Sequence, residues 1–142
     1  MRRLTLALRV LLALVFLYAA YTKLRQPWML FAMSIDAYQL FPQWAVLLLG
    51  HWLPWLEVLI GVFLLVGVLL RYVAAGATVL LIIFFALMTR AFIKGMTIDC
   101  GCFGLGEAIS AKTLLRDGFL LTLSIVLTVL AARSNRLRSA SE

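Results

Sequence analysis

The sequence predicts an all-α membrane protein, a four-transmembrane-helix bundle with a short interfacial helix between spans one and two. Hydrophobic residues make up 65% of the 142-residue chain, and the mean hydropathy of +1.07 is far above that of soluble domains. Four apolar stretches are long enough to cross a bilayer, which takes about 20 helical residues. None of them alternates apolar and polar residues as barrel strands do, so the spans are predicted to be helices.

The expected spans cover residues 4–21, 44–70, 72–93 and 114–132, and together they form one transmembrane domain over residues 1–133. Residues 134–142 are expected to form a disordered polar tail. The first span follows Arg2 and Arg3, as a signal peptide would, but it lacks a small-residue cleavage pattern. We therefore expect it to be retained as a helix.

The segment from Pro27 to Pro42 separates the first two spans and mixes aromatic and polar residues. Its apolar residues recur near helical spacing, which is typical of a short amphipathic helix lying in the membrane interface. Pro27 suits a helix start, and Pro42 ends the segment before the second span.

The basic residues indicate how the chain lies in the membrane. The net charge is +7, but the basic residues stand at the ends of spans and do not form a stripe with aromatic residues, which argues against a nucleic-acid partner. Four spans put both termini on one side, and the terminal flanks carry clustered arginines. By the positive-inside rule we expect both termini in the cytoplasm and the protein in the inner (plasma) membrane. Four of the six acidic residues lie on the other side: Asp36, Asp99, Glu107 and Asp117.

A cysteine pair, Cys100-Gly101-Cys102, lies in the loop between the third and fourth spans. Cysteines one residue apart can close only a small, strained ring, and strained disulfides are typical of exchange-competent bonds. In thiol-disulfide exchange one cysteine would attack a partner's disulfide and the other would resolve the mixed disulfide; which one attacks stays open. Arg90 and Arg116 flank the loop and would favour a thiolate there.

Two other interpretations of this pair stay open. The cysteines could hold a structural turn, either as inert thiols or as a permanent bridge. They could also grip a soft metal ion such as Cu(I) or Zn²⁺, but two ligands make a weak site, and the single histidine lies in another segment. No metal site is therefore predicted.

Glu57 stands near the middle of the second span, where a charge costs at least roughly 2.5–3.5 kcal/mol. Such a carboxylate is expected to face the bundle interior, protonated or paired with a cation. Lys23, Arg90 and Arg116 are the candidate partners. The residue would either transfer protons and anchor the cysteine loop, or pin the bundle through a buried hydrogen bond.

Aromatic residues gather where the spans meet the interface. His51, Trp52 and Trp55 are typical of an aromatic belt, although a histidine near the loop could also shuttle protons. A bundle lined by aromatic side chains offers a surface to a quinone, and the same side chains serve ordinary packing. Coupling to a quinone therefore stays open.

The motifs of the chain resemble a known family. The sequence reads Lys-Leu-Arg-Gln-Pro at 23–27, Pro-Trp-Leu-Glu at 54–57, Cys-Gly-Cys-Phe-Gly at 100–104 and Arg-Asp at 116–117. In order and spacing these motifs resemble the methylamine utilisation protein MauE family, within the wider DoxX-like group of four-helix membrane proteins. Gln26 departs from the pattern, which has an acidic residue before the proline.

The resemblance implies a membrane protein that assists disulfide chemistry or the maturation of secreted redox proteins beside a thioredoxin-like partner. The group also looks like the membrane thiol oxidoreductases related to vitamin K epoxide reductase, which use a CxxC pair. This chain has CxC and no second pair, so a partner's cysteines would complete the relay. The candidate catalytic residues are Cys100, Cys102, Glu57, Arg90 and Arg116. The alternative is a non-catalytic membrane subunit or assembly factor of a larger complex.

Overall fold

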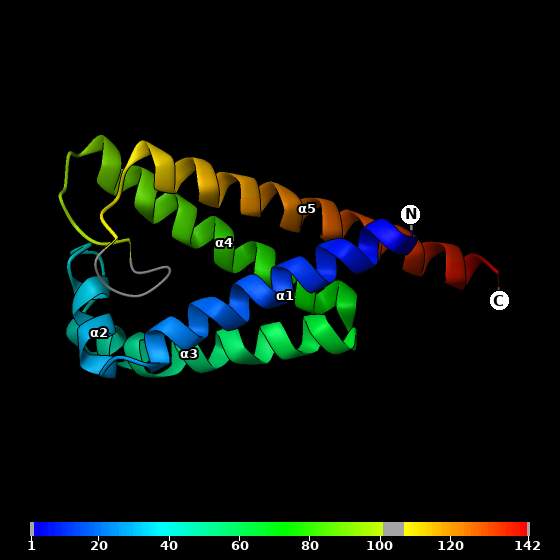
Figure 1. The fold of residues 1–142 in the computed structure, drawn as a ribbon, viewed down its shortest axis with the longest axis horizontal. Helices are drawn as coiled ribbons and strands as arrows, with labels where there is room; N and C mark the ends of the chain where they lie inside the picture. Colours follow the sequence, from blue (N-terminus) through cyan, green and yellow to red (C-terminus); the bar gives the residue numbers. More distant parts are fainter. Residues whose placement is uncertain (1, 101–106, 142) are drawn as a thin grey trace.

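The computed structural model describes residues 2–100 and 107–141, and the helices account for most of them (Figure 1). Four helices are long and apolar enough to cross a membrane, which confirms the predicted fold class. The described residues contain no β-strand beyond one isolated bridge. The helices are α1 (Arg2–Leu24), α2 (Trp28–Asp36), α3 (Gln43–Val66), α4 (Leu70–Ile93) and α5 (Ala111–Ala140).

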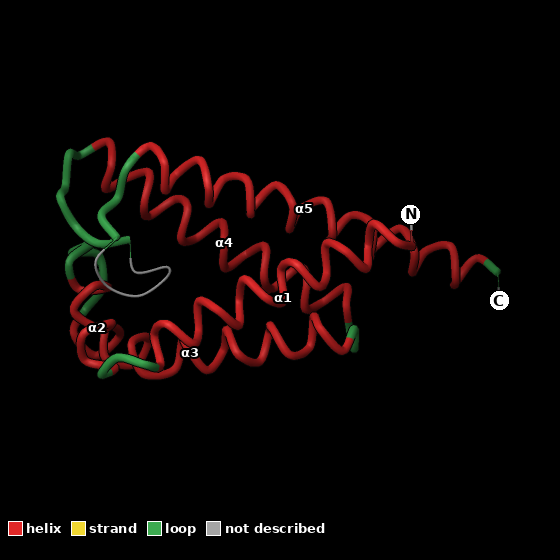
Figure 2. Tube along the Cα trace, viewed as in Figure 1, coloured by secondary structure: helices red, strands yellow, loops and turns green. Residues whose placement is uncertain are grey.

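The long helices form two closely packed pairs, α1 with α3 and α4 with α5. Contacts of α1 with α5 and of α3 with α4 join the pairs into one bundle. Both termini lie at the end of the bundle where α3 turns into α4, and α2 lies at the opposite end with the segment between α4 and α5 (Figures 1 and 2). Cys100 and the outer ends of α1 and α5 are thus at opposite ends of the bundle, as four spans require.

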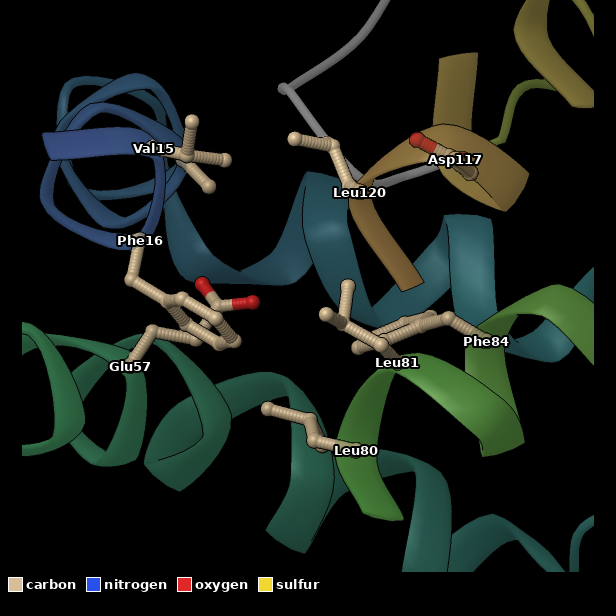
Figure 3. A pocket seen from close by; sticks show the side chains of 9 residues that line it. Val15, Phe16, Glu57, Leu80, Leu81, Phe84, Asp117 and Leu120 are labelled. Atoms are coloured by element: carbon tan, nitrogen blue, oxygen red, sulfur yellow. The ribbon is translucent and has the colours of Figure 1, made fainter. Parts of the chain in front are cut away.

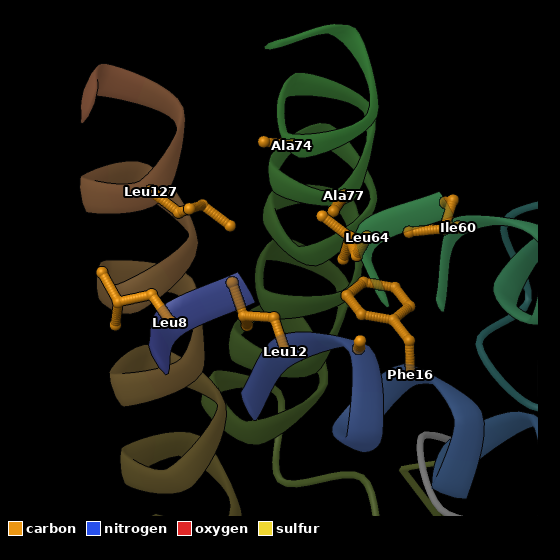
Figure 4. Packing of buried hydrophobic residues seen from close by; sticks show 9 residues of the cluster. Leu8, Leu12, Phe16, Ile60, Leu64, Ala74, Ala77 and Leu127 are labelled. Atoms are coloured by element: carbon orange, nitrogen blue, oxygen red, sulfur yellow. The ribbon is translucent and has the colours of Figure 1, made fainter. Parts of the chain in front are cut away.

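The main core lies where all four long helices meet, around α1 (Figure 4). Small residues allow close approach here: a Cβ atom added to Gly61 of α3 would lie 2.7 Å from Cγ of Leu17 of α1. Small residues at helix contacts are the usual means of packing in a bilayer, where apolar burial gives little driving force. The buried residues of this core are Leu8, Leu12, Ala13, Phe16, Ile60, Leu64, Ala74, Ala77 and Leu127.

Helix α2 lies between the first two spans, as predicted, and packs on α3. Its buried side includes Phe31 and Ile35, which join a second apolar cluster with Val46 and Leu53 of α3. Gly50 permits this contact, because an added Cβ atom would lie 2.7 Å from the Cβ atom of α2 residue Ala32. Helix α2 is therefore packed against the end of the bundle at which Cys100 lies.

Two helix ends differ from the predicted span ends by four residues or more. The second span ends at Val66, before the predicted residue 70, because Gly67 adopts φ +84° and caps α3 in the left-handed conformation that glycine permits. Helix α5 runs on to Ala140, so the prediction that the tail from residue 134 is disordered is wrong for residues 134–140. Residues 133–141 are exposed and continue a helix already nucleated by the last span.

The start of α5 is set by a local motif. The side chain of Ser110 accepts a hydrogen bond from the backbone N–H of Thr113, and the Thr113 hydroxyl accepts one from the N–H of Ser110. This reciprocal pair satisfies two N–H groups that the first turn would leave unbonded. Ser110 is therefore the N-cap of α5, and Arg116 and Asp117 fall in the second turn of the helix.

Candidate functional site

A buried ion pair joins α1 to α3. The Nζ atom of Lys23 lies 2.6 Å from Oε1 of Glu57, and the two side chains are 0% and 4% exposed. Rings of Phe31 and Phe84 lie 5.0 and 5.3 Å from the ammonium group, close enough for cation–π attraction. Lys23 is thus enclosed by one carboxylate and two aromatic faces, from α3, α2 and α4.

The partner of Glu57 is therefore Lys23, one of the three candidates that the sequence offers. Arg90 donates instead to the Tyr38 carbonyl, and Arg116 contacts the carboxylate of Glu107. The reason is position: Lys23 lies in the last turn of α1, where a cation is also favoured by the helix dipole, and α1 and α3 pack along their lengths.

A second charged cluster lies at the start of α5. Nη1 of Arg116 lies 2.5 Å from Oε1 of Glu107, and Nε of Arg116 lies 3.2 Å from Oδ1 of Asp117. Arg116 and Glu107 are about one third exposed, at 34% and 37%, whereas the Asp117 side chain is 7% exposed. The guanidinium group of Arg116 therefore connects the partly exposed carboxylate of Glu107 with the buried carboxylate of Asp117.

Cys100 adjoins this cluster and is only 1% exposed. Its Sγ atom donates a weak hydrogen bond of 3.8 Å to Oε2 of Glu107, and its backbone N–H donates to the Glu107 carbonyl at 2.9 Å. An antiparallel bridge between Asp99 and Ala108 extends this pairing. The thiol is thus held against a carboxylate whose other oxygen contacts Arg116.

Tyr38 contacts both Cys100 and Arg90. Its hydroxyl donates to the Cys100 carbonyl at 3.0 Å, and the Tyr38 carbonyl accepts from Nη1 of Arg90 at 3.4 Å. Arg90 and Arg116 therefore each contact a residue that touches Cys100. The sequence predicted that both arginines flank the loop, and the structure brings both next to it.

Of the predicted catalytic residues, Cys102 lies outside the described residues. Two residues that touch Cys100 were not predicted as part of the site: Tyr38 and Glu107. Glu107 follows Cys100 by seven residues within the same loop, a separation at which a short hairpin brings two residues together. Nothing in the sequence around Tyr38 indicates its contact with residues 62 positions later.

A small, partly open cavity of about 40 Å³ lies between the long helices, with one residue of each charged cluster in its lining (Figure 3). Glu57 and Asp117 line it from α3 and α5. The other lining residues are apolar: Val15, Phe16, Ala19, Leu80, Leu81, Phe84 and Leu120. It is the size of a few water molecules and too small for a quinone ring.

A larger groove of about 460 Å³ lies between α3 and α4. Its lining is apolar apart from Tyr72, and it includes Leu59, Phe63 and Ile83. An isoprenoid or acyl chain fits such a surface, but the two carbonyl groups of a quinone would meet almost no hydrogen-bond donors there. Neither cavity therefore fits a quinone head group, and no step is assigned to one.

His51 is surrounded by aromatic side chains. The His51 ring packs edge to face against Trp28 and Trp52, each with ring centroids 5.5 Å apart, as in an aromatic belt. Within residues 2–100 and 107–141, no three His, Cys, Asp or Glu side chains come together to hold a metal ion.

Comparison with known proteins relates the chain to one family. The model of the family "Methylamine utilisation protein MauE" matches residues 1–130. The methylamine utilization protein MauE of Paracoccus denitrificans is 35% identical over 128 residues, which is 88% of this chain and 64% of that relative, so the chain spans less than two thirds of the relative's length. No solved structure matches the chain. The chain belongs to the MauE family of membrane proteins.

Proposed function

We propose that this chain is an integral membrane thiol-disulfide redox or maturation protein that serves methylamine utilisation, as the name of its Paracoccus denitrificans relative says of that protein. Its cysteine pair would exchange electrons with a thioredoxin-like partner outside the cytoplasm. The motifs shared with the family and the contacts of Cys100 support this function.

The observation that carries the proposal is the contact of the Cys100 thiol with the Glu107 carboxylate. A carboxylate at a thiol can accept its proton, and the thiolate so formed is the nucleophile of disulfide exchange. Arg116 neutralises the charge of Glu107 and would remain beside the thiolate after proton transfer. Tyr38 fixes the Cys100 backbone, so that the sulfur keeps its orientation.

The exchange starts from a reduced cysteine pair and a disulfide in the partner. One thiolate of the pair attacks a partner sulfur; a mixed disulfide forms, the partner's bond breaks, and its other sulfur leaves as a thiolate that takes up a proton. The second cysteine loses its proton and attacks the first, which forms the Cys100–Cys102 disulfide and releases the partner's second thiolate. Two electrons and two protons pass to the partner, and the reverse sequence oxidises it.

The decisive experiment is a redox titration of the pair. Purified protein is equilibrated in glutathione buffers of known potential, alkylated and weighed by mass spectrometry. We expect a reversible two-electron transition above roughly −300 mV, the range of exchange-competent disulfides. A pair that never oxidises or never reduces contradicts the proposal. The Cys102→Ser variant is the control, since it retains Cys100 and cannot form the internal bond.

The proposed location is the plasma membrane, with both termini in the cytoplasm and residues 94–110 outside. The clustered arginines at both ends of the chain support this orientation. A membrane-impermeant maleimide on intact cells tests it: single cysteines placed at exposed positions Lys94 and Ala108 should react, and one placed at Arg136 should not. The opposite pattern would reverse the orientation and put the thiols on the reducing side.

A second function is favoured by the burial of Cys100, which is 1% exposed. A thiol so enclosed also suits a non-catalytic subunit or assembly factor, in which the loop only shapes the end of the bundle. The two functions differ in what Cys100→Ser and Cys102→Ser do in cells. If this chain replaces its Paracoccus relative, both variants should abolish growth on methylamine under the redox function, and both should support growth under the assembly function.

A further inference from the structure

The Glu57 carboxylate is only half satisfied by its ion pair. Oε1 contacts Lys23, whereas Oε2 is buried and has no hydrogen-bond partner among the described residues. Burial of a carboxylate oxygen without a partner costs several kcal/mol in most proteins, which makes a ligand at that oxygen favourable. In Figure 3 the Glu57 carboxylate points toward the space enclosed by Phe16 and Leu81.

The cavity at this carboxylate has the volume and polarity that water requires. Each water molecule needs about 10–15 Å³ of such volume and two or more polar partners. A cavity of about 40 Å³ therefore has room for about three or four molecules. The carboxylate of Asp117, on the opposite wall, supplies the second polar partner, and that side chain is 7% exposed.

We propose that this cavity is an internal hydration site in which water bridges the carboxylates of Glu57 and Asp117. Bridging water gives Oε2 of Glu57 the donor that the protein does not supply. It also connects the two charged clusters of the molecule, because Asp117 contacts Arg116, and Arg116 contacts the Glu107 carboxylate that touches Cys100. A proton held by either carboxyl group can then pass to the other through this water, which leaves the number of bound protons unchanged.

Coupling of this site to the cysteines rests on the proposed function. When Glu107 accepts the thiol proton it becomes neutral, and the charge of Arg116 then acts on Asp117 alone. The hydration of Asp117 and Glu57 should therefore respond to the redox state of the pair. The hydration site itself does not depend on any redox activity.

Two leucines on one face of α5 provide a matched test of hydration. Leu120 lines the cavity, whereas Leu127, two turns later, lies in the apolar core. Both leucines are buried, with 8% of Leu120 and 0% of Leu127 exposed. With leucine methyl groups labelled in the full chain in lipid nanodiscs, cross-relaxation with water is measured by nuclear magnetic resonance. We expect a water cross-peak at Leu120 and none at Leu127. No cross-peak at Leu120, or equal cross-peaks at both, would overturn the proposal.

Infrared difference spectra between the oxidised and reduced protein test the coupling separately. We expect carboxyl bands that disappear in Glu57→Gln or Asp117→Asn, while the control Asp36→Asn leaves them unchanged; Asp36 is an exposed acid on α2. Glu107 contributes a band of its own that persists in both variants. If no other carboxyl band is lost in Glu57→Gln or Asp117→Asn, the coupling is overturned. If the cysteines show no redox transition at all, the proposed function fails, and the methyl cross-peaks still decide the hydration site.

Discussion

The ion pairs Lys23–Glu57 and Arg116–Glu107 have the same chemistry and opposite surroundings. The Lys23–Glu57 pair is almost fully enclosed and joins helices that are 34 residues apart in the chain. The Arg116–Glu107 pair is about one third exposed and joins residues nine apart. Enclosure makes the first pair a condition for helix packing, because either charge left alone would be stranded in the bundle. Because the Arg116–Glu107 pair is partly exposed, it contributes little to the free energy of unfolding and can still influence the neighbouring Cys100 thiol.

The largest effect is expected from breaking the enclosed pair. Glu57→Leu leaves the Lys23 ammonium buried without a carboxylate, which should lower the free energy of unfolding by about 3–5 kcal/mol. Unfolding in mixed micelles, with increasing denaturing detergent, measures this loss. A loss below about 1 kcal/mol would mean that the pair is not a condition for packing.

Replacing both Lys23 and Glu57 tests whether the bundle depends on the charges themselves or only on their mutual compensation. Lys23→Met combined with Glu57→Leu removes both charges and keeps apolar volume, and such replacements are often neutral or stabilising. We expect the double variant to unfold within about 1 kcal/mol of the unaltered protein, in the same micelle assay. A double variant as unstable as Glu57→Leu would show that the charges themselves, and not their mutual compensation, hold α1 against α3.

A smaller effect is expected at Tyr38, which touches the cysteine segment without being charged. Tyr38→Phe removes the hydroxyl that donates to the Cys100 carbonyl, which should cost about 0.5–1.5 kcal/mol. The released backbone should make Cys100 react faster with iodoacetamide, measured in the Cys102→Ser background by mass spectrometry. The matched control is Tyr72→Phe, on an exposed part of α4. Equal rates in the two variants would contradict a positioning role for Tyr38.

The smallest effect on stability is expected from the exposed pair. Glu107→Gln should change the free energy of unfolding by less than about 1 kcal/mol, because the pair is partly exposed. The same variant should slow alkylation of Cys100, since an amide cannot accept the thiol proton. Asp36→Asn, an exposed acid on α2, is the control and should leave the rate unchanged. An unaltered rate in Glu107→Gln would remove the carboxylate from the proposed exchange.

The composition and spacing of the chain were sufficient to predict the helical membrane fold. Apolar runs near 20 residues predict spans wherever they occur, since a bilayer offers backbone groups no water. The sequence also predicts the short helix between Pro27 and Pro42, because its spacing and its boundaries depend on near neighbours in the chain. It also identifies Glu57 as a buried group, since a carboxylate in a span must face the bundle.

Only the tertiary structure decided which groups meet. Three cations could compensate Glu57 equally well by sequence, and the packing of α1 along α3 selects Lys23. Tyr38 reaches Cys100 across 62 residues because α2 and the cysteine segment lie at the same end of the bundle. Helix periodicity specifies which face of a helix is buried, but the partner of a buried polar group depends on helix order and relative depth. Those are properties of the assembled bundle, and contacts so distant in the chain leave no local pattern to read.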